Sequence, residues 1–301
     1  MMAVTANCVS HLYFNTKFNK MKTILVPTDF SDYALQAIRT AVPIATATGA
    51  KIVLLHNVYT ETKWEAVPIL KRHEYPETLK KILEADKRIN SLVNSNLLRK
   101  VSISYILTYG VAYEEIALKA KQLKVDLILM GSHGNEASDR NFIGSTVQKV
   151  LREATCPVMT IQKKYTPGKW RKLVFATDFS KETYKYFEKI KNLALALNSV
   201  VYLMFVNRPT DFLDTRTVNR LMDSFIARYP DLKFHKVIYN HEDTSEGILQ
   251  FVEDYPSMDW IALITQRRNA KPKYVIGNTE TLAFHSHIPV LSVNILATPL
   301  K

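Results

Sequence analysis

The sequence predicts an α/β protein made of two tandem doubly wound modules, each a five-stranded parallel sheet flanked by helices. Short apolar runs alternate with longer segments of helical period along the 301 residues, which is the pattern of repeated βαβ units. The chain also contains an internal repeat, because KTILVPTDFSDYALQAI at 22–38 returns as RKLVFATDFSKETYKYF at 171–187. A duplicated module accounts for both observations, since it repeats one order of strands and helices.

The later parts of the two copies also correspond. VDLILMG and FIGSTVQKVLREATCPVMTI in the first copy are similar to MDWIALIT and VIGNTETLAFHSHIPVLSV in the second. We therefore expect a first module at 21–163, a second at 171–301 and a linker at 164–170, which contains a Pro-Gly pair. Residues 1–20 precede the first strand pattern and are either a flexible extension or a result of start-site choice.

The alternation gives the elements of the first module in order. Strands are expected at 22–27, 51–57, 101–107, 126–130 and 157–161, and helices at 31–48, 75–98, 112–122 and 144–153. Ser31 is suited to cap the first helix and Gly49 to end it. Pro43 lies inside that helix and predicts a kink or a local break.

The charge of the chain favours an anionic partner. The formal net charge is +12, from 40 Lys and Arg against 28 Asp and Glu. The basic residues are scattered along helical faces, as in LKKILEADKRI at 79–89, which is typical of solvated surface. A nucleic-acid partner is not expected, because the sequence offers no groove-reading helix and no aromatic platform for RNA.

Cysteine content and apolar run lengths bear on location. The two cysteines, Cys8 and Cys156, give neither a disulfide framework nor a zinc-binding spacing, and Cys156 is expected to be a buried free thiol. The N-terminus lacks the apolar core of a secretory signal, and no segment has the apolar length of a membrane span. We therefore expect a cytoplasmic protein without a membrane partner.

A glycine-rich loop follows the fourth predicted strand. Phosphate groups are held by converging backbone N–H groups, and a helix start supplies both the donors and a favourable dipole. Gly131 and Gly134 would let the chain turn sharply and approach a ligand closely. Gly144, Ser145 and Thr146 begin the next helix with N–H groups and two hydroxyls. The alternative is an ordinary turn between a strand and a helix.

The end of the first strand lies where a ligand would be expected. In a doubly wound sheet, ligands bind outside the carboxyl ends of the strands, where the strand order reverses. Asp29, which follows Thr28 at this point, is suited to accept hydrogen bonds from a ribose or an adenine edge, or to hold a magnesium-bound water. The alternative is that Asp29 orders its own turn, and the recurrence of Thr-Asp-Phe-Ser in the second copy favours this alternative.

These motifs resemble those of the universal stress protein family. The spacing Gly131-x2-Gly134-x9-Gly144-Ser145 is similar to that family's ATP-binding signature, and ILVPTDFS, VLLHNV, YGVAYEEI and LILMGSHG resemble its other landmarks. The resemblance covers nearly all of residues 22–296 as a tandem pair. It implies two Rossmann-like domains of the adenine nucleotide alpha hydrolase-like type and a stress-response role. It also implies ATP, with or without Mg²⁺, in a cleft between the first and fourth strands.

Carried over by position, the resemblance implies a set of ATP-binding residues. Those on the adenosine side would be Pro27, Thr28, Asp29 and Asn57; those under the ribose and phosphates would be Met130, Gly131, His133 and Gly134; those at the helix start would be Gly144, Ser145, Thr146 and Val147. Asn57 departs from the family, which often has an aliphatic residue there, so Val58 is the alternative adenine contact.

His133 admits two interpretations. It is either a general base beside a triphosphate or a packing and hydrogen-bonding residue, and the sequence fixes no partner carboxylate or nucleophile for the first role. The favoured function is therefore a regulatory protein that binds ATP. The alternatives are a slow ATPase or autophosphorylating enzyme that uses Ser145, Thr146 or His133, and a scaffold protein without nucleotide turnover.

The second copy has lost part of the motif. ITQRR at 264–268 stands where the first copy has MGSHG, the spacing before IGNT is interpreted as shorter, and both loop glycines are gone. We expect the second module either to have lost this mode of ATP binding or to bind another anion through a basic loop, unless that loop is only solvated surface. The basic residues concerned are Arg267, Arg268, Lys271 and Lys273.

The last strand of each module offers an unpaired edge. CPVMTI and IPVLSV are expected to pair with each other and to form a pseudo-dimer within one chain. Association of two chains into a homodimer is the further alternative. The internal pairing alone would cover both edges.

Overall fold

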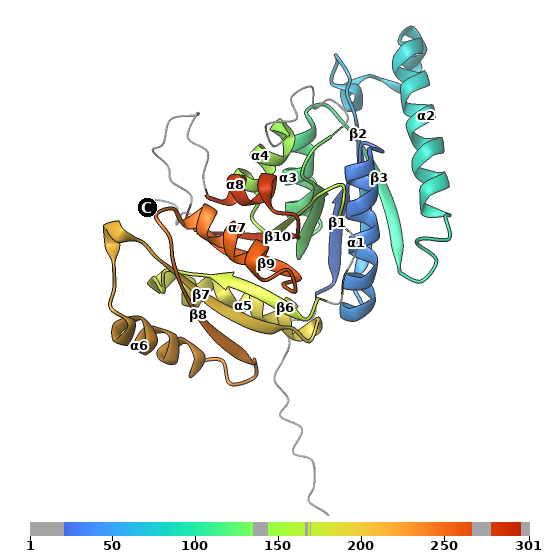
Figure 1. The fold of residues 1–301 in the computed structure, drawn as a ribbon. Coiled ribbons are helices and arrows are strands. Elements are labelled where there is room, and N and C mark those ends of the chain that lie inside the picture. The colour runs from blue at the N-terminus through green and yellow to red at the C-terminus, as the bar shows by residue number, and fades with distance from the viewer. Residues whose placement is uncertain (1–20, 135–143, 166–167, 169, 267–277, 296–301) are drawn as a thin grey trace, which may run out of the picture.

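Figure 1 shows the fold as a computed structural model, in which residues 21–134, 144–165, 168, 170–266 and 278–295 are described. The strands of the first module are β1 (Thr23–Pro27), β2 (Lys51–Val58), β3 (Ile103–Tyr109), β4 (Leu127–Gly131) and β5 (Val158–Ile161). Its helices are α1 (Asp32–Thr48), α2 (Pro76–Val93), α3 (Ala112–Gln122) and α4 (Ser145–Glu153), with the 3-10 helices η1 (Trp64–Ala66) and η2 (Ile69–Glu74) before α2.

The second module repeats this order. Its strands are β6 (Lys172–Ala176), β7 (Val200–Asn207), β8 (Phe234–Asn240), β9 (Trp260–Gln266) and β10 (Val290–Ile295). Its helices are α5 (Lys181–Ala196), α6 (Thr215–Ile226), α7 (Thr244–Asp254) and α8 (Asn278–His285), with the 3-10 helix η3 (Pro209–Asp211) before α6. Strands and helices therefore alternate in both modules, as the repeat predicts.

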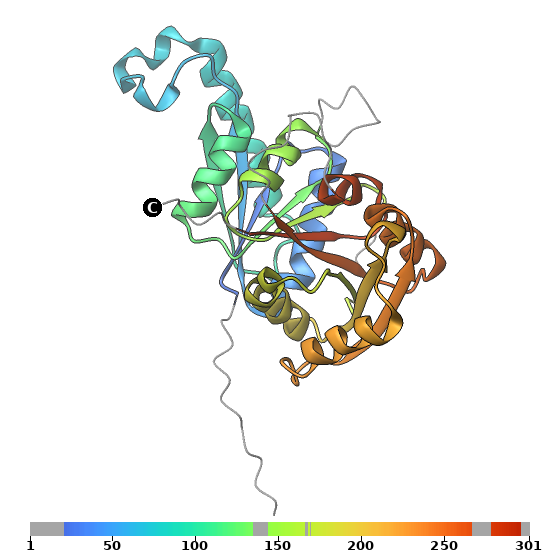
Figure 2. The same ribbon diagram turned by 90° about the vertical axis from the view of Figure 1, so that its left-hand side faces the viewer.

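The ten strands of the described residues form one sheet in the order β3-β2-β1-β4-β5-β10-β9-β6-β7-β8. Within each module every neighbouring pair of strands is parallel. The prediction of two tandem five-stranded parallel sheets is thus confirmed. Figure 2 shows that the segment from η1 to the start of α2 extends beyond the rest of the first module.

The ends of α1 follow the predicted capping signals. Ser31 Oγ accepts the N–H of Ala34 at 3.1 Å and so satisfies one of the open donors of the first turn. Gly49 ends the helix at a φ of 71°, and its N–H donates to the carbonyl of Ala45. A left-handed residue of this kind is favourable for glycine, which has no β-carbon.

Two helices differ from the prediction. Pro43 does not break α1, which is continuous through it, so the predicted local break is wrong. Its neighbours Ala41 and Ile44 are completely buried, and this packing offsets the backbone hydrogen bond that proline cannot make. Helix α2 ends at Val93, before the predicted boundary at residue 98, and the side chain of its C-cap residue Asn94 donates back to the carbonyl of Asn90 at 2.9 Å.

Helices cover both faces of the sheet. One hydrophobic core extends through both modules under α1, α2, α5 and α6, and it includes Ile38 of the first module and Phe225 of the second. The opposite face carries two separate cores, one with Val150 under α3 and α4 and one with Phe251 under α7 and α8. The shared core joins the two modules into one body.

The modules meet through β5 and β10, which pair in antiparallel fashion. Met159 faces Leu291, and these residues hold equivalent positions in the two copies of the last strand. The pairing is therefore symmetrical about a local two-fold axis, as in a homodimer with an isologous interface. The predicted pseudo-dimer within the chain is confirmed.

Strand register corrects the alignment of the two copies by one residue. Leu127 and Trp260 pair with equivalent positions in β1 and β6. GSHG at 131–134 therefore corresponds to ITQR at 264–267, and the interval to the IGST and IGNT motifs is equal in both copies. The loop of the second module is not shorter, and only its residue types differ.

Cys156 is buried and free, and burial raises the pKa of its thiol to about 11. This confirms the predicted buried thiol, whereas Cys8 lies outside the described residues. Among the described helices, none combines the length and the apolar character needed to span a bilayer.

Candidate functional site

The loop after β1 forms a tight turn that leads into α1. Thr28 Oγ1 accepts the N–H of Phe30 at 3.1 Å, and Asp29 Oδ1 accepts the N–H of Ser31 at 3.0 Å. Phe30 has a positive φ of 63°, which is uncommon for a residue with a side chain and is supported here by both hydrogen bonds. Asp29 therefore orders its own turn, as the second interpretation of this residue predicts.

The same turn recurs after β6. The N–H of Phe179 donates to Thr177 Oγ1 at 3.0 Å, the N–H of Ser180 donates to Asp178 Oδ1 at 2.9 Å, and Phe179 has a φ of 57°. The repeated Thr-Asp-Phe-Ser is thus accounted for by local structure in both modules. Any difference in ligand binding between the modules must come from other residues.

The strand order reverses between β1 and β4, which are parallel neighbours. Their carboxyl ends bring the Thr28–Asp29 turn next to the glycine loop. A β-carbon placed on Gly134 would lie only 2.7 Å from Asp29 Oδ2. Two segments predicted from separate motifs therefore meet at the point where doubly wound sheets bind their ligands.

The steric requirement for glycine differs among the three glycine positions of the loop. A β-carbon on Gly131 would lie 2.6 Å from Tyr33 Cβ and 2.9 Å from its carbonyl oxygen, so this position must be glycine for α1 to pack on β4. Gly131 thus has a packing role that the sequence did not predict, and the close approach of a ligand to Gly131 stays a prediction. Among the described residues, a β-carbon on Gly144 would have no neighbour closer than 3.6 Å, so their sterics do not require glycine there.

The start of α4 has no side-chain cap among the described residues. Gly144 precedes the helix, and its N–H donates to the carbonyl of Ser132 at 3.2 Å. Ser145 is exposed and Thr146 is half-buried, whereas Val147 is buried in the core. Ser145 and Thr146 are therefore able to reach a phosphate with their hydroxyls, but Val147 only with its backbone.

His133 is a packed residue of the loop. It is buried, its Nδ1 lies 2.9 Å from Ser132 Oγ, and its ring centroid lies 4.9 Å from that of Tyr33. The centroid of the Phe284 ring, from α8 of the second module, lies 5.4 Å from that of His133. These contacts support the packing and hydrogen-bonding interpretation of His133.

Gln162, which follows β5, connects this loop to the second module. Its Oε1 accepts a hydrogen bond from Ser132 Oγ at 3.0 Å. Its Nε2 donates to the carbonyls of Ala283 and Phe284 in α8, at 3.1 and 2.6 Å. Sequence reasoning missed Gln162, although a polar residue follows the same apolar strand segment in both copies and was a usable signal.

Asn57 and Val58 occupy the end of β2. Asn57 Nδ2 donates to the carbonyl of Gly110 at 2.8 Å, and its Oδ1 accepts from Thr108 Oγ1 at 3.0 Å. The amide of Asn57 thus joins the ends of β2 and β3, and Val58 is buried. Pro27 and Met130, at the ends of β1 and β4, are buried as well.

A stack of three side chains lies beside the turn. Arg88 of α2 places its guanidinium 4.2 Å from the centroid of the Phe30 ring, and that ring lies 4.5 Å from the ring of His56. His56 Nδ1 lies 2.7 Å from the carbonyl oxygen of Thr28. Burial lowers the pKa of His56, the Thr28 carbonyl opposes that effect, and the charge of Arg88 adds to it.

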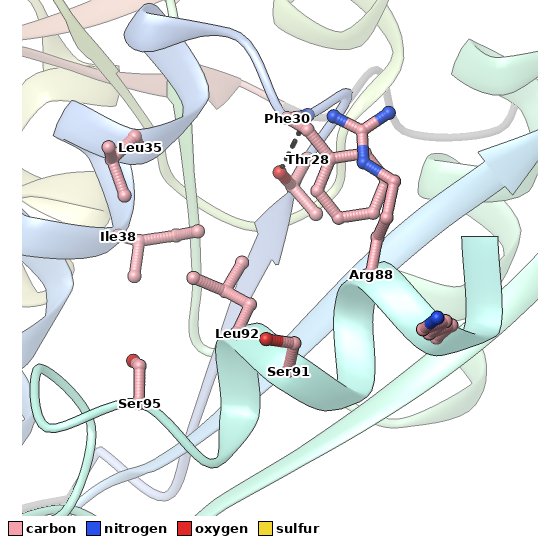
Figure 3. A pocket seen from close by; sticks show the side chains of 9 residues that line it. Thr28, Phe30, Leu35, Ile38, Arg88, Ser91, Leu92 and Ser95 are labelled. Carbon is pink, nitrogen blue, oxygen red and sulfur yellow. Dashed lines mark hydrogen bonds between the residues drawn. The ribbon is translucent and has the colours of Figure 1, made fainter. Parts of the chain in front are cut away.

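A cavity of about 550 Å³ lies under this stack, between α1 and α2. Figure 3 shows Leu35 and Ile38 of α1 on one side and Leu92 of α2 on the other. Ser95 Oγ is buried at this cavity and has no hydrogen-bond partner among the described residues. The full lining is Thr28, Phe30, Leu35, Ile38, Lys87, Arg88, Ser91, Leu92 and Ser95. Of the predicted ATP-binding residues it contains only Thr28, so this space adjoins the predicted cleft rather than forming it.

The corresponding place in the second module is packed with aromatic rings. Phe179, the equivalent of Phe30, stacks on Phe205, the equivalent of His56, at 6.1 Å. Phe187, the equivalent of Ile38, lies 4.8 Å from Phe225 of α6. The same fold therefore leaves space in one copy and fills it in the other.

Some predicted residues lie outside the described parts of the chain. These are Arg267, Arg268, Lys271 and Lys273 of the second module, and residues 135–143, between Gly134 and Gly144, also lie outside the described parts. The described residues contain no cluster of three or more His, Cys, Asp or Glu suited to a metal ion. A magnesium-bound water at Asp29 stays a prediction.

The fold and the strand-end loops together define a tandem Rossmann-like protein with a candidate phosphate-binding loop in its first module. Residues 20–162 match the model of a family described as the universal stress protein family. A universal stress protein of Methanocaldococcus jannaschii is 30% identical over 153 residues, which are 48% of this chain and 84% of that protein. One of Thermus aquaticus is 36% identical over 144 residues, 47% of this chain and 98% of that protein. The chain belongs to the universal stress protein family.

A solved structure extends the likeness to both modules. The crystal structure of a universal stress protein from Archaeoglobus fulgidus superposes with a TM-score of 0.71 and covers 90% of this chain and 98% of that one. Its sequence identity is 17%, so the comparison shows the fold alone. The tandem α/β architecture is shared with that protein.

Proposed function

We propose that this universal stress protein binds one ATP molecule, in the first module, and acts as a nucleotide-dependent regulator in a stress response. The observation that carries the proposal is the close approach of Gly134 to Asp29 at the point where the strand order reverses. It joins the two predicted halves of the site, the strand end and the glycine loop. Adenine and ribose would lie toward Thr28 and Asp29.

The start of α4 fits the phosphate groups. Its first-turn N–H groups have no side-chain cap within the described residues, and the helix dipole favours an anion there. In the second module Thr265, the equivalent of Ser132, places its hydroxyl 2.6 Å from that of Thr279 in the first turn of α8. This hydroxyl pair occupies space near the helix start, which supports a single competent site.

Binding is tested by titration calorimetry and by native mass spectrometry of freshly purified protein. We expect one equivalent of ATP per chain. Gly134→Val should abolish binding, because its side chain would collide with the Asp29 carboxylate, whereas Arg268→Ala in the second module should leave it unchanged. Absence of bound nucleotide together with absence of binding in solution would falsify the proposal.

One enzymatic alternative is favoured by a specific residue. Ser145 is the first residue of α4 and is exposed, so its hydroxyl would be accessible to a phosphate bound at the helix start. Autophosphorylation at Ser145 is therefore the second candidate function. It predicts a phosphorylated peptide after incubation with a saturating concentration of labelled ATP. This peptide should disappear in Ser145→Ala even when that variant is saturated with ATP.

Association of two chains also belongs to the proposal. The internal pairing of β5 with β10 already covers the edge through which two single-module chains would pair. A tandem chain that associates further must therefore use another surface. Sedimentation at several concentrations distinguishes a monomer from a dimer.

A further inference from the structure

The last strand of each module carries an equivalent side-chain amide, the clamp, which donates hydrogen bonds to the last helix of the opposite module. Gln162 follows β5, and Asn294 occupies the same position of β10 in the second copy. Asn294 Nδ2 donates to the carbonyls of Leu151 and Ala154 at the end of α4, at 2.7 and 3.1 Å. Gln162 Nε2 donates in the same way to two carbonyls at the end of α8. Each module thus holds the last helix of the other.

The clamp of Gln162 has a second function that the clamp of Asn294 does not share. Gln162 Oε1 also accepts the hydroxyl of Ser132, which lies in the glycine loop. In the second module the corresponding hydroxyl, that of Thr265, bonds to Thr279 at 2.6 Å and lies 3.4 Å from Ser292 Oγ. Among the described residues, the connection from clamp to loop is therefore found in the first module and not in the second.

The direction of each hydrogen bond in this chain of contacts is fixed. Carbonyl oxygens only accept, so the two α8 carbonyls require the NH₂ end of the Gln162 amide, and its oxygen must face Ser132. That oxygen also only accepts, so Ser132 donates its one proton to Gln162. His133 Nδ1, 2.9 Å from Ser132 Oγ, must then be the donor to the hydroxyl.

We infer that Gln162 is a positioning residue through which α8 of the second module sets the hydrogen bonding of the first module's glycine loop, and that the neutral form of His133 is held as its Nδ1–H tautomer. In that tautomer Nε2 is an acceptor, so the imidazole presents a lone pair. The second module, which lacks the loop glycines, acts as the support of the site in the first. This arrangement of hydrogen bonds is inferred from interatomic distances alone, whereas its effect on ligand binding rests on the proposed nucleotide site.

The tautomer is tested by NMR of protein labelled with ¹⁵N-histidine, at a pH where His133 is neutral. His133 is assigned from the spectrum of His133→Gln. We expect a protonated Nδ1 and an unprotonated Nε2 in the native chain, and a shift of the His133 signals toward the other tautomer in Gln162→Met, which keeps the side-chain length but has no amide. A native His133 with a protonated Nε2, or an unchanged spectrum in Gln162→Met, overturns the inference.

Two further variants separate positioning from docking of the modules. Asn294→Leu removes the mirror clamp, which touches α4 and not the loop, and should leave the His133 signals unchanged. Ser132→Ala keeps the hydrogen bonds of Gln162 to α8 but removes the hydroxyl that accepts from His133 Nδ1. It should therefore shift the His133 signals as Gln162→Met does, and it serves as the test if Gln162→Met fails to fold. If Asn294→Leu shifts His133 as much as Gln162→Met does, loss of module docking is the cause and the positioning role is wrong.

The consequence for the ligand is measured by ATP titration. Gln162→Met should weaken ATP binding by about three- to tenfold, the net effect of one hydrogen bond, while Asn294→Leu stays within about twofold of the native chain. Equal losses in both variants contradict a specific role of Gln162. If the native chain binds no ATP, the proposed function fails, but the tautomer experiment still decides the inference.

Discussion

Gly131 and Tyr33 touch so closely that a β-carbon on the glycine would lie 2.6 Å from Tyr33 Cβ and 2.7 Å from its carbonyl carbon. The first glycine of the ATP-binding signature is therefore required where α1 packs against the end of β4. The second glycine, Gly134, faces a carboxylate instead. The same motif combines a residue that the fold needs with one that the candidate site needs, and variants should separate the two.

Gly131→Ala should destabilise the protein. The new methyl group has no room against the backbone of Tyr33, and overpacking of this kind costs about 1–3 kcal/mol. Chemical denaturation gives the change in the free energy of unfolding. Tyr33→Ala should not relieve the strain, because alanine keeps the β-carbon and carbonyl that cause it. A Gly131→Ala protein as stable as the native chain would show that α1 moves freely away from β4.

Gly134→Ala should reduce ATP affinity much more than stability. Its methyl group would lie 2.7 Å from Asp29 Oδ2, so the carboxylate and its turn must shift. We expect at least a tenfold weaker ATP binding, with a free energy of unfolding lowered by less than about 1 kcal/mol. In an Asp29→Ala background the same substitution should cost less, since the oxygen is gone, and a double-mutant cycle measures this coupling. Additive effects would mean that the two residues act independently.

Most of the fold follows from the sequence because the repeat and the alternation of strands and helices are local signals. The pairing of β5 with β10 was also predictable, since each copy ends in an apolar edge strand. The site was predictable only where its residues adjoin in sequence, as in the Thr28–Asp29 turn. Phe284 contacts the loop across the module boundary, and Gln162 joins the loop to α8 across the same boundary. Such contacts depend on the three-dimensional placement of α8. The one-residue error in aligning the two loops arose because apolar strands look alike in any register, and only backbone pairing fixes that register.

His56 should make stability depend on pH. Burial lowers its pKa below the usual 6.5, so between the two pKa values the unfolded state binds more protons than the folded state. The stabilisation is complete above the unfolded pKa and is lost as the pH falls through the folded pKa. His56→Phe, which copies Phe205 of the second module, should therefore flatten the dependence of the unfolding free energy on pH below about 6.5. An unchanged slope in this variant would assign the pH dependence to other groups.

The cavity between α1 and α2 should accept a larger side chain. Ile38 of α1 is completely buried and lines the cavity of about 550 Å³, and the second module has Phe187 at the equivalent position, 4.7 Å from Phe175. Ile38→Phe should thus be tolerated, with an unfolding free energy that stays within about 1 kcal/mol of the native value or rises, since the ring enters existing space.

Ile44→Phe is the matched control, because Ile44 is equally buried on the same helix but does not line the cavity, and it should cost about 1–3 kcal/mol. Urea titrations of both variants give the comparison. Equal losses would show that the space between α1 and α2 closes in solution and that the difference in packing between the two modules is smaller than the structure indicates.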